Sequence, residues 1–269
     1  MSDSIVPTPS VDLIVRMSYN IDFKDKILKI LGSGAKVAAI SGSANGKDLR
    51  GFASQLSAAR RWMKFIKIIR LTPDLLDPLA DVRSFNFKKS TPMDVIKLAL
   101  SKSEFFADIF QMLAEDVHTL HKAKFWTSGL GFRPVSNIDI IEDRAWWFWS
   151  LLATINSYIE FRETSRKLRS SQLRMEALNP QTVADEILRM KQEIVILKIK
   201  YYMVLFKLIK FACEVIDSSI ALTPDHIKAA STNPAAFELI SCFVGSLSAL
   251  SSLHKLLYTE SQSIRSGRK

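Results

Sequence analysis

The sequence has few of the residues that interrupt helices or cross-link small secreted domains. Its 269 residues include nine glycines, nine prolines and two cysteines. Because apolar residues recur mostly at intervals of three and four, we find no convincing strand and expect helices along most of the chain. The two cysteines, Cys213 and Cys242, do not form the framework of a disulfide-rich domain, so they favour a reducing, cytosol-facing location.

Signals for secretion, SKL-type import and ordinary membrane spanning are also missing. The N-terminal residues MSDSIVPTPSVDL lack a basic region followed by an apolar run. The last three residues, Gly267-Arg268-Lys269, do not match the SKL address. No uncharged apolar run reaches the ~20 residues that a spanning helix needs. We therefore expect any membrane association to use amphipathic helices or a span interrupted by polar residues.

Motifs of enzyme chemistry are absent as well. The stretch SGSANGKD is not a phosphate-binding loop, because Ser41 stands where the motif needs glycine and Asp48 where it needs Ser or Thr. Glu115, His118 and His121 recur at three-residue steps but lack the i, i+4 histidine pair of a helical metal site. No nucleophile motif is present either. We expect no enzymatic activity, no metal and no cofactor.

The chain does have an excess of positive charge. Its formal net charge is +10, its isoelectric point is about 9.6, and 48% of its residues are hydrophobic. This composition fits neither a disordered chain nor one embedded wholly in lipid. It favours an anionic partner, which is either nucleic acid or phospholipid.

The pattern predicts an all-α protein, a membrane-associated bundle of long amphipathic and hydrophobic helices. Three helix starts place a capping side chain before proline, at Thr91-Pro92, Asn179-Pro180 and Asn233-Pro234. We expect helices at about 21–40, 50–70, 72–82, 92–124, 138–175, 180–222 and 234–259.

We expect a single folded domain between two tails. Residues 1–20 are the N-terminal tail, residues 21–260 a helical membrane-associated domain, and residues 261–269 a basic C-terminal tail. Within the domain, the amphipathic part covers about 21–124 and the hydrophobic part with the long helices about 138–259.

Residues 60–70, RRWMKFIKIIR, are the most unusual amphipathic segment. At about 100° per residue, one face gathers four apolar side chains, Trp62, Phe65, Ile66 and Ile69. The basic side chains occupy the opposite face and its flanks: Arg60, Arg61, Lys64, Lys67 and Arg70. Such a helix suits core packing with a solvated back, contact with nucleic acid, or binding flat on an anionic membrane.

The long helix expected near 180–222 carries one polar stripe on an otherwise apolar surface. The stripe consists of Lys200, Lys207, Lys210, Glu214 and Asp217. It fits either a bundle helix with one wet edge or a helix with lipid or protein on three sides and water along the fourth.

Two further stretches are candidates for deeper insertion. Residues 145–161 begin with three tryptophans, which suit either the headgroup level of a membrane or a buried aromatic core. Residues 235–257 have only a short uncharged run, from 239 to 253, yet we interpret them as the integral anchor. Their small residues Ser241, Gly245 and Ala249 repeat at four and predict a face for helix packing or self-association. The alternative is a buried helix of a soluble protein.

Taken in order, the segments resemble the peroxin-eleven family (peroxisomal biogenesis factor 11). The stretches that carry the resemblance cover about residues 21–258: DKILKILGSGAKVAA, SAARRWMKFIKIIRLTPDLLDPL, FFADIFQMLAEDVHTLHKAKFW, DRAWWFWSLLATINSYIEFRETSRKLR, LFKLIKFACEVIDSSIALTPDHI and AFELISCFVGSLSALSSLHKLL. Their order and spacing carry it, since each piece alone is merely amphipathic. The chain departs from the family in lacking a dilysine ending and in having Glu115-Asp116 where an Asp-Asn pair is usual.

The resemblance implies a non-enzymatic protein of the peroxisomal membrane, or of a related organelle such as the glycosome, that promotes elongation, division and proliferation. It implies that residues 60–70 lie in the cytosolic leaflet, with the apolar residues inserted and the basic ones on anionic phospholipid. It also implies self-association and recruitment of fission machinery that includes a dynamin-like GTPase. At rest, the apolar face of this segment has a second possible place, packed on a neighbouring helix.

Two other functions stay open as alternatives. One is a membrane channel for small metabolites, lined by Lys200, Lys207 and Lys210. The other is a basic helical nucleic-acid binder. It is disfavoured because the aromatic residues of 60–70 lie opposite the charge, so we expect no nucleic-acid partner.

Overall fold

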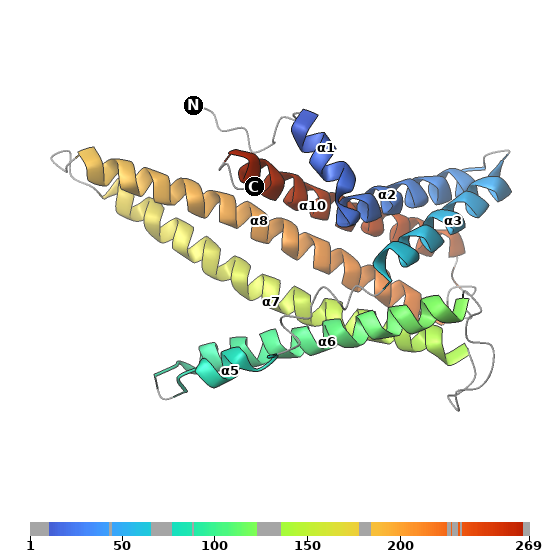
Figure 1. Cartoon of the computed structure of the whole chain (residues 1–269), viewed down its shortest axis with the longest axis horizontal. Helices are drawn as coiled ribbons and strands as arrows, with labels where there is room; N and C mark the ends of the chain where they lie inside the picture. The colour runs from blue at the N-terminus through green and yellow to red at the C-terminus, as the bar shows by residue number, and fades with distance from the viewer. Residues whose placement is uncertain are drawn as a thin grey trace.

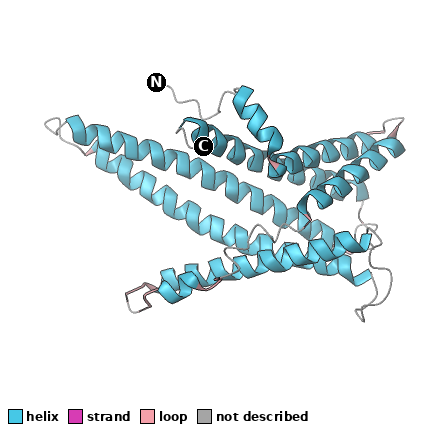
Figure 2. Ribbon diagram, viewed as in Figure 1, coloured by secondary structure: helices cyan, strands magenta, loops and turns pink. Residues whose placement is uncertain are grey.

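Every element that the computed structural model describes is a helix, as the composition predicts (Figure 2). The described residues are 11–42, 45–65, 77–87, 89–122, 136–177, 184–224, 227, 231 and 233–265. Within them the helices are α1 (Val11–Tyr19), α2 (Ile21–Ile40), α3 (Gly46–Lys64), α5 (Ala80–Ser84), α6 (Pro92–Lys122), α7 (Ser136–Glu176), α8 (Ala184–Leu222) and α10 (Pro234–Arg265).

Six of the helices pack as a closed ring, in which each contacts the next and the last contacts the first. The two longest, α7 and α8, lie side by side through the middle of the molecule (Figure 1). α6 packs on α7, while α10 packs on α8 and α2 packs on α10. α2 is paired with α3, and the end of α3 comes back to touch α6.

Helices begin at the positions that the capping residues and prolines of the sequence predict. α2 begins after Asn20, whose side-chain oxygen accepts the backbone N–H groups of Asp22 and Phe23 at 2.9 and 3.2 Å. α6 begins at Pro92 with a reciprocal box, in which Thr91 and Asp94 each accept the backbone N–H of the other. α10 begins at Pro234, and Asn179-Pro180 lies outside the described residues.

Both ends of the chain contain helix where we expected tails. α1 forms within residues 1–20, because Leu13 and Met17, one turn apart, bury themselves in contact with the rest of the fold. α1 packs on α10 and α2. α10 in turn continues to Arg265, beyond the expected end at 259. The local sequence does not predict α1 or the extension of α10, because the contacts of α1 with α10 and α2 form only when these helices pack together.

The helix expected over 50–70 is shorter than predicted. α3 ends at Lys64, and Phe65 leaves the helical conformation at φ −53° and ψ 135°. Residues 66–76 lie outside the described part, so only α5 represents the helix expected over 72–82.

Small residues make up most of the buried face of α7, which also includes Leu152, while several large apolar residues point away from it. The small residues that are at most 5% exposed are Ser150, Ala153, Ser157, Thr164 and Ser171. The exposed set is Ile141, Phe148, Ile155 and Tyr158. Small side chains let helix backbones approach closely, a packing mode typical of helices in membranes.

We predict that the site of Ser157 tolerates no larger side chain and that the Ser157 hydroxyl itself destabilises the fold. Its Oγ is buried and makes no hydrogen bond within the described residues. Ser157→Ala should therefore raise the free energy of unfolding, by about 1 kcal/mol, because the buried hydroxyl no longer has to lose its water. Ser157→Leu should lower it by about 1–3 kcal/mol through overpacking.

Thermal unfolding in detergent measures both changes. Ile155→Leu, at an exposed position of the same helix, is the matched control and should leave the melting temperature unchanged. A Ser157→Leu protein that melts with the parent would show that the α7 packing is loose.

Candidate functional site

An apolar stripe runs along the outer surface of α6. Its large members, Ile96, Phe106, Phe110, Leu113 and Val117, are between 42 and 57% exposed. Together with the exposed small residues Ala99 and Ser103, they follow steps of three and four, so they share one face. From first to last the stripe extends about 32 Å, at 1.5 Å per residue.

The other sides of α6 hold its charged residues against neighbouring helices. Lys97 pairs with Glu163 of α7, and Glu104 accepts a hydrogen bond from the Asn156 amide of α7. Lys102 donates to Asp81 of α5 at 2.7 Å. The amphipathic helix is thus turned with its apolar face outward, the reverse of a helix in a water-soluble bundle.

Near the end of α6, Glu115 and His118 also contact neighbouring helices. His118 is buried and contacts Glu142 of α7, while its Nδ1 lies 3.0 Å from Arg61 Nη1 of α3. Glu115 pairs with Lys64 of α3 at 3.4 Å. The histidine and the acid therefore join three helices, and an arginine occupies the space beside the imidazole.

α10 has an exposed apolar face and a face that packs on other helices. Leu239, Ile240, Phe243 and Leu250 are exposed on one side. Within the described residues, α10 is the one helix that is long and apolar enough to cross a membrane, over Ala235–Ser261. The charged residues that shorten its uncharged run lie toward the ends, and Glu238 pairs with Arg50 of α3 at 3.7 Å.

The small residues of α10 face other parts of the same chain. Ser241 donates a hydrogen bond to Asp217 of α8, and Ala249 is fully buried. A Cβ added to Gly245 would lie 3.2 Å from Lys29 Cε of α2. The face expected for helix packing or self-association is therefore occupied by α8 and α2.

Three of the basic residues of 60–70 point into the protein. Arg60 donates from Nε to Asp25 of α2 at 3.0 Å, and Lys64 lies 3.9 Å from the same carboxylate. Arg61 lies against His118. The apolar Trp62 is instead 45% exposed, with the Phe65 ring 5.5 Å from its own. The remaining predicted contacts, Ile66, Lys67, Ile69 and Arg70, lie outside the described residues.

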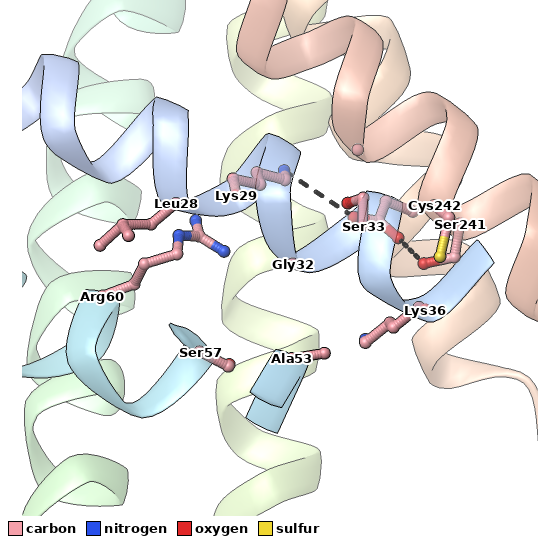
Figure 3. Close-up of a pocket in the computed structure, with 12 residues that line it drawn as sticks. Leu28, Lys29, Gly32, Ser33, Lys36, Ala53, Ser57, Arg60, Ser241 and Cys242 are labelled. Atoms are coloured by element: carbon pink, nitrogen blue, oxygen red, sulfur yellow. Dashed lines mark hydrogen bonds and ion pairs between the residues drawn. The ribbon is translucent and has the colours of Figure 1, made fainter. Parts of the chain in front are cut away.

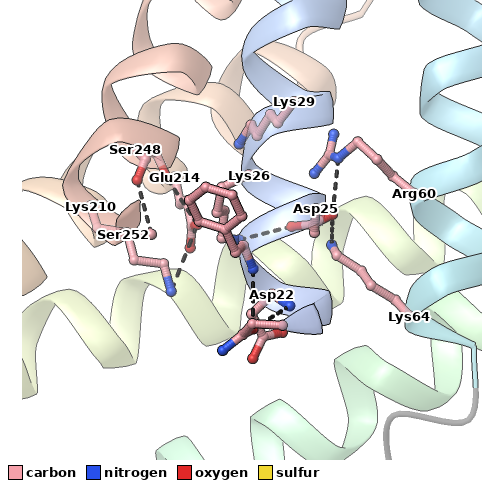
Figure 4. A network of polar contacts seen from close by, with 12 residues as sticks. Asp22, Asp25, Lys26, Lys29, Arg60, Lys64, Lys210, Glu214, Ser248 and Ser252 are labelled. Carbon is pink, nitrogen blue, oxygen red and sulfur yellow. Dashed lines mark hydrogen bonds and ion pairs between the residues drawn. The ribbon is translucent and has the colours of Figure 1, made fainter. Parts of the chain in front are cut away.

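Asp25 is the acid on which this arrangement converges (Figure 4). Its side chain is 2% exposed and meets Lys26 and Arg60 at 3.0 Å each, as well as Lys64. Burial opposes ionisation, but the charges of Lys64, Lys26 and Arg60 outweigh it and hold the pKa of Asp25 well below its ordinary value. No motif or spacing marks this role in the sequence, because Asp25 is one of two aspartates on α2 and its partners Arg60 and Lys64 lie on another helix.

The lysines of the long helix do not share one environment. Lys200 is exposed, Lys207 pairs with Glu160 of α7 at 3.3 Å, and Lys210 lies over the Phe211 ring. The acids of the stripe turn toward other helices: Glu214 accepts from Ser248 of α10. This distribution gives no support to a lysine-lined path.

The tryptophans of 145–161 pack within the fold. Trp147 donates its indole N–H to Ser219 of α8 at 3.0 Å, and the Trp149 ring meets Phe211 edge-on at 5.4 Å. Phe148 between them is exposed. Of the two interpretations left open, these contacts support the aromatic core for Trp147 and Trp149.

Comparison with known proteins gives one match. The family model of peroxisomal biogenesis factor 11 (PEX11) matches residues 11–257. No curated protein and no solved structure matches the chain.

We predict that Asp25→Asn destabilises the protein by about 3 kcal/mol, because it leaves buried cations without their counter-charge. The pH dependence has a definite sign. Asp25 has a lower pKa in the folded chain, so its contribution is complete above the unfolded value, about 4, and is lost as the pH falls below it. The variant should therefore lose less stability than the parent between pH 5 and 3.

Denaturant unfolding in detergent across that pH range tests the prediction. Asp48→Asn, an exposed aspartate in the first turn of α3, is the control and should differ little from the parent. An Asp25→Asn protein with the parent's stability and acid sensitivity would contradict the role given to Asp25.

Proposed function

The chain belongs to the peroxisomal biogenesis factor 11 family, and we propose that it elongates the peroxisomal membrane by inserting the outward apolar face of α6 into one leaflet. Membership implies a role in peroxisome proliferation and membrane elongation, at the peroxisomal membrane. Proteins of the family are generally non-enzymatic and shape membranes. The finer mechanism is our proposal.

The observation that carries the proposal is the orientation of α6. An apolar stripe about 32 Å long faces outward, while Lys97, Lys102 and Glu104 are satisfied by neighbouring helices. A helix lying in the interface buries its apolar face about 5–10 Å into the leaflet. Because this expands one leaflet and not the other, it favours the curvature of a tubule.

The exposed face of α10 supports an anchor beside this wedge. Its length and composition suit a span, and its polar face is already satisfied by α8 and α2. The outward residues Phe243 and Leu250 would then contact lipid. Self-association and contact with fission machinery that includes a dynamin-like GTPase remain part of the proposal as family expectations.

Residues 60–70 have a secondary place in this mechanism. Trp62 and Phe65 contact the interface first, since Trp62 is exposed in the folded chain and tryptophan favours the headgroup level. Arg61 and Lys64 reach anionic phospholipid only after leaving their partners in the protein, whereas Arg60 holds Asp25 through Nε and keeps its terminal nitrogens for a lipid phosphate. Ile66, Lys67, Ile69 and Arg70 would extend the same contact on the cytosolic side.

We predict that Phe110→Lys weakens membrane binding and abolishes tubulation of vesicles. A charge in the middle of an inserted face costs about 2.5–3.5 kcal/mol at the bilayer centre and less near the interface. Leu188→Lys is the matched control, because Leu188 is as exposed as Phe110 but lies among charged residues at the start of α8.

Flotation with vesicles that contain anionic lipid and electron microscopy of the same vesicles provide the two measurements. Both variants should keep the melting temperature of the parent, since both residues point outward. Tubulation by Phe110→Lys at the parent's level would exclude α6 as the wedge.

We also predict that substitutions of Trp62 and Lys64 have different effects, the first mainly on vesicle binding and the second on stability. Trp62→Ala should reduce vesicle binding more than it reduces stability, because the ring is 45% exposed and suits the headgroup level. Lys64→Glu should lower the melting temperature, because it sets a third carboxylate beside Asp25 and Glu115. If Lys64→Glu instead melts like the parent and loses only its preference for anionic vesicles, Lys64 contacts lipid and not these acids.

A further inference from the structure

A polar cavity of about 120 Å³ lies where four helices meet (Figure 3). Residues of α2 and α3 line two of its sides, and Asp217 of α8 and residues of α10 line the others. A buried water needs roughly 10–15 Å³ of such space, so this cavity is large enough for a group the size of a phosphate.

Cations dominate the lining of the cavity. Lys29 and Lys36 reach it from α2 and Arg60 from α3, whereas Asp217 is the single acid of the lining. Asp217 is itself engaged, accepting a hydrogen bond from Ser241. The hydroxyl groups of Ser33, Ser57 and Ser241 add neutral polar atoms at the wall.

Lys29 is a buried cation with incomplete compensation. Its side chain is 14% exposed, and its closest acid, Asp217 Oδ2, stands 4.0 Å away. An ammonium group has three hydrogen-bond donors, and this contact is too long to satisfy one of them. Burial lowers the pKa of Lys29, and the carboxylates of Glu214 and Asp217 oppose that shift without cancelling it.

The remaining two cations also keep donors available. Arg60 uses Nε for Asp25, and within the described part of the chain its terminal nitrogens have no second acid. Lys36 is exposed at the mouth and has no ion pair among the described residues. Gly245 leaves room for the Lys29 side chain, since a Cβ at that position would lie 3.2 Å from Lys29 Cε and the lysine would have to shift.

From this geometry we infer that the cavity binds a phosphate group, held by Lys29, Lys36 and Arg60. A phosphate offers several acceptor oxygens at one centre, which matches cations that converge from two helices. The group belongs either to a lipid headgroup entering from the membrane surface or to a free phosphorylated molecule. The inference goes beyond membrane elongation and does not depend on the α6 stripe.

The first experiment uses the full chain in detergent and inorganic phosphate as the probe. Thermal unfolding is followed as phosphate replaces chloride at constant ionic strength, so that general screening is held fixed. A ligand that binds only the folded chain raises the melting temperature with its concentration. The second experiment compares flotation on phosphatidylcholine vesicles that contain phosphatidic acid, an exposed phosphomonoester, or phosphatidylglycerol at equal charge.

Two lysine variants of α2 distinguish a site from general attraction. Lys36→Gln removes a cavity cation that carries no structural pair, so it should fold with the parent's stability in chloride. Losing one charge-assisted contact, about 1.5 kcal/mol or more, should weaken phosphate binding at least about tenfold. Lys24→Gln makes the same charge change at an exposed position of α2 outside the cavity and should bind as the parent does.

The two experiments also separate the sources of the phosphate. Stabilisation by inorganic phosphate supports a free ligand, and preference for phosphatidic acid over phosphatidylglycerol supports a lipid headgroup. In either arm the effect must fall in Lys36→Gln and persist in Lys24→Gln. The inference is overturned if neither arm responds, or if both variants lose the effect equally. Since tubulation is not measured, failure here leaves the proposed function standing, and loss of tubulation in Phe110→Lys leaves this site standing.

Discussion

The buried carboxylate of Asp25 is the constraint on which the arrangement of α2, α3 and α6 depends. A charge so deep in the protein is stable only with partners, and it draws Arg60 and Lys64 inward from α3. Lys64 then reaches on to Glu115 of α6. Once the basic side of α3 faces the protein, Trp62 has to face outward. The same inward turn brings Arg60 beside Lys29, so the cationic cavity is a second consequence of this pairing.

Other helices of the fold, like α3, turn polar or small residues inward and apolar residues outward. Serine, threonine and alanine make up most of the buried face of α7, and many large apolar residues of α6, α7 and α10 are exposed. In water such a surface would leave an extended apolar area uncovered, whereas in a bilayer it is the expected one. Membership of the PEX11 family and the one candidate span among the described residues are two independent observations that favour a membrane environment.

The candidate site was only partly predictable. The repeat of apolar residues along α6 is visible in the sequence, but periodicity does not tell whether a face meets protein or lipid. In residues 60–70, Trp62 is exposed while Arg60 and Lys64 meet acids of other helices, and nothing local in the sequence shows that those acids hold the basic side. Gly245 and Ser241 were recognised as a close-packing face, but the partner is α8 and α2 of the same chain.

By itself the sequence determined the all-helical class, the limits of α2 and the starts of α6 and α10, because caps, proline and apolar period act within a few residues. It also carried the family, through the order of its segments. Tertiary structure alone decided that α1 is a helix, that α3 ends at Lys64, and which way each amphipathic helix turns. Those outcomes depend on contacts between residues far apart in the chain, such as Arg60 with Asp25 and Arg61 with His118. Their energy exists only once the helices have packed.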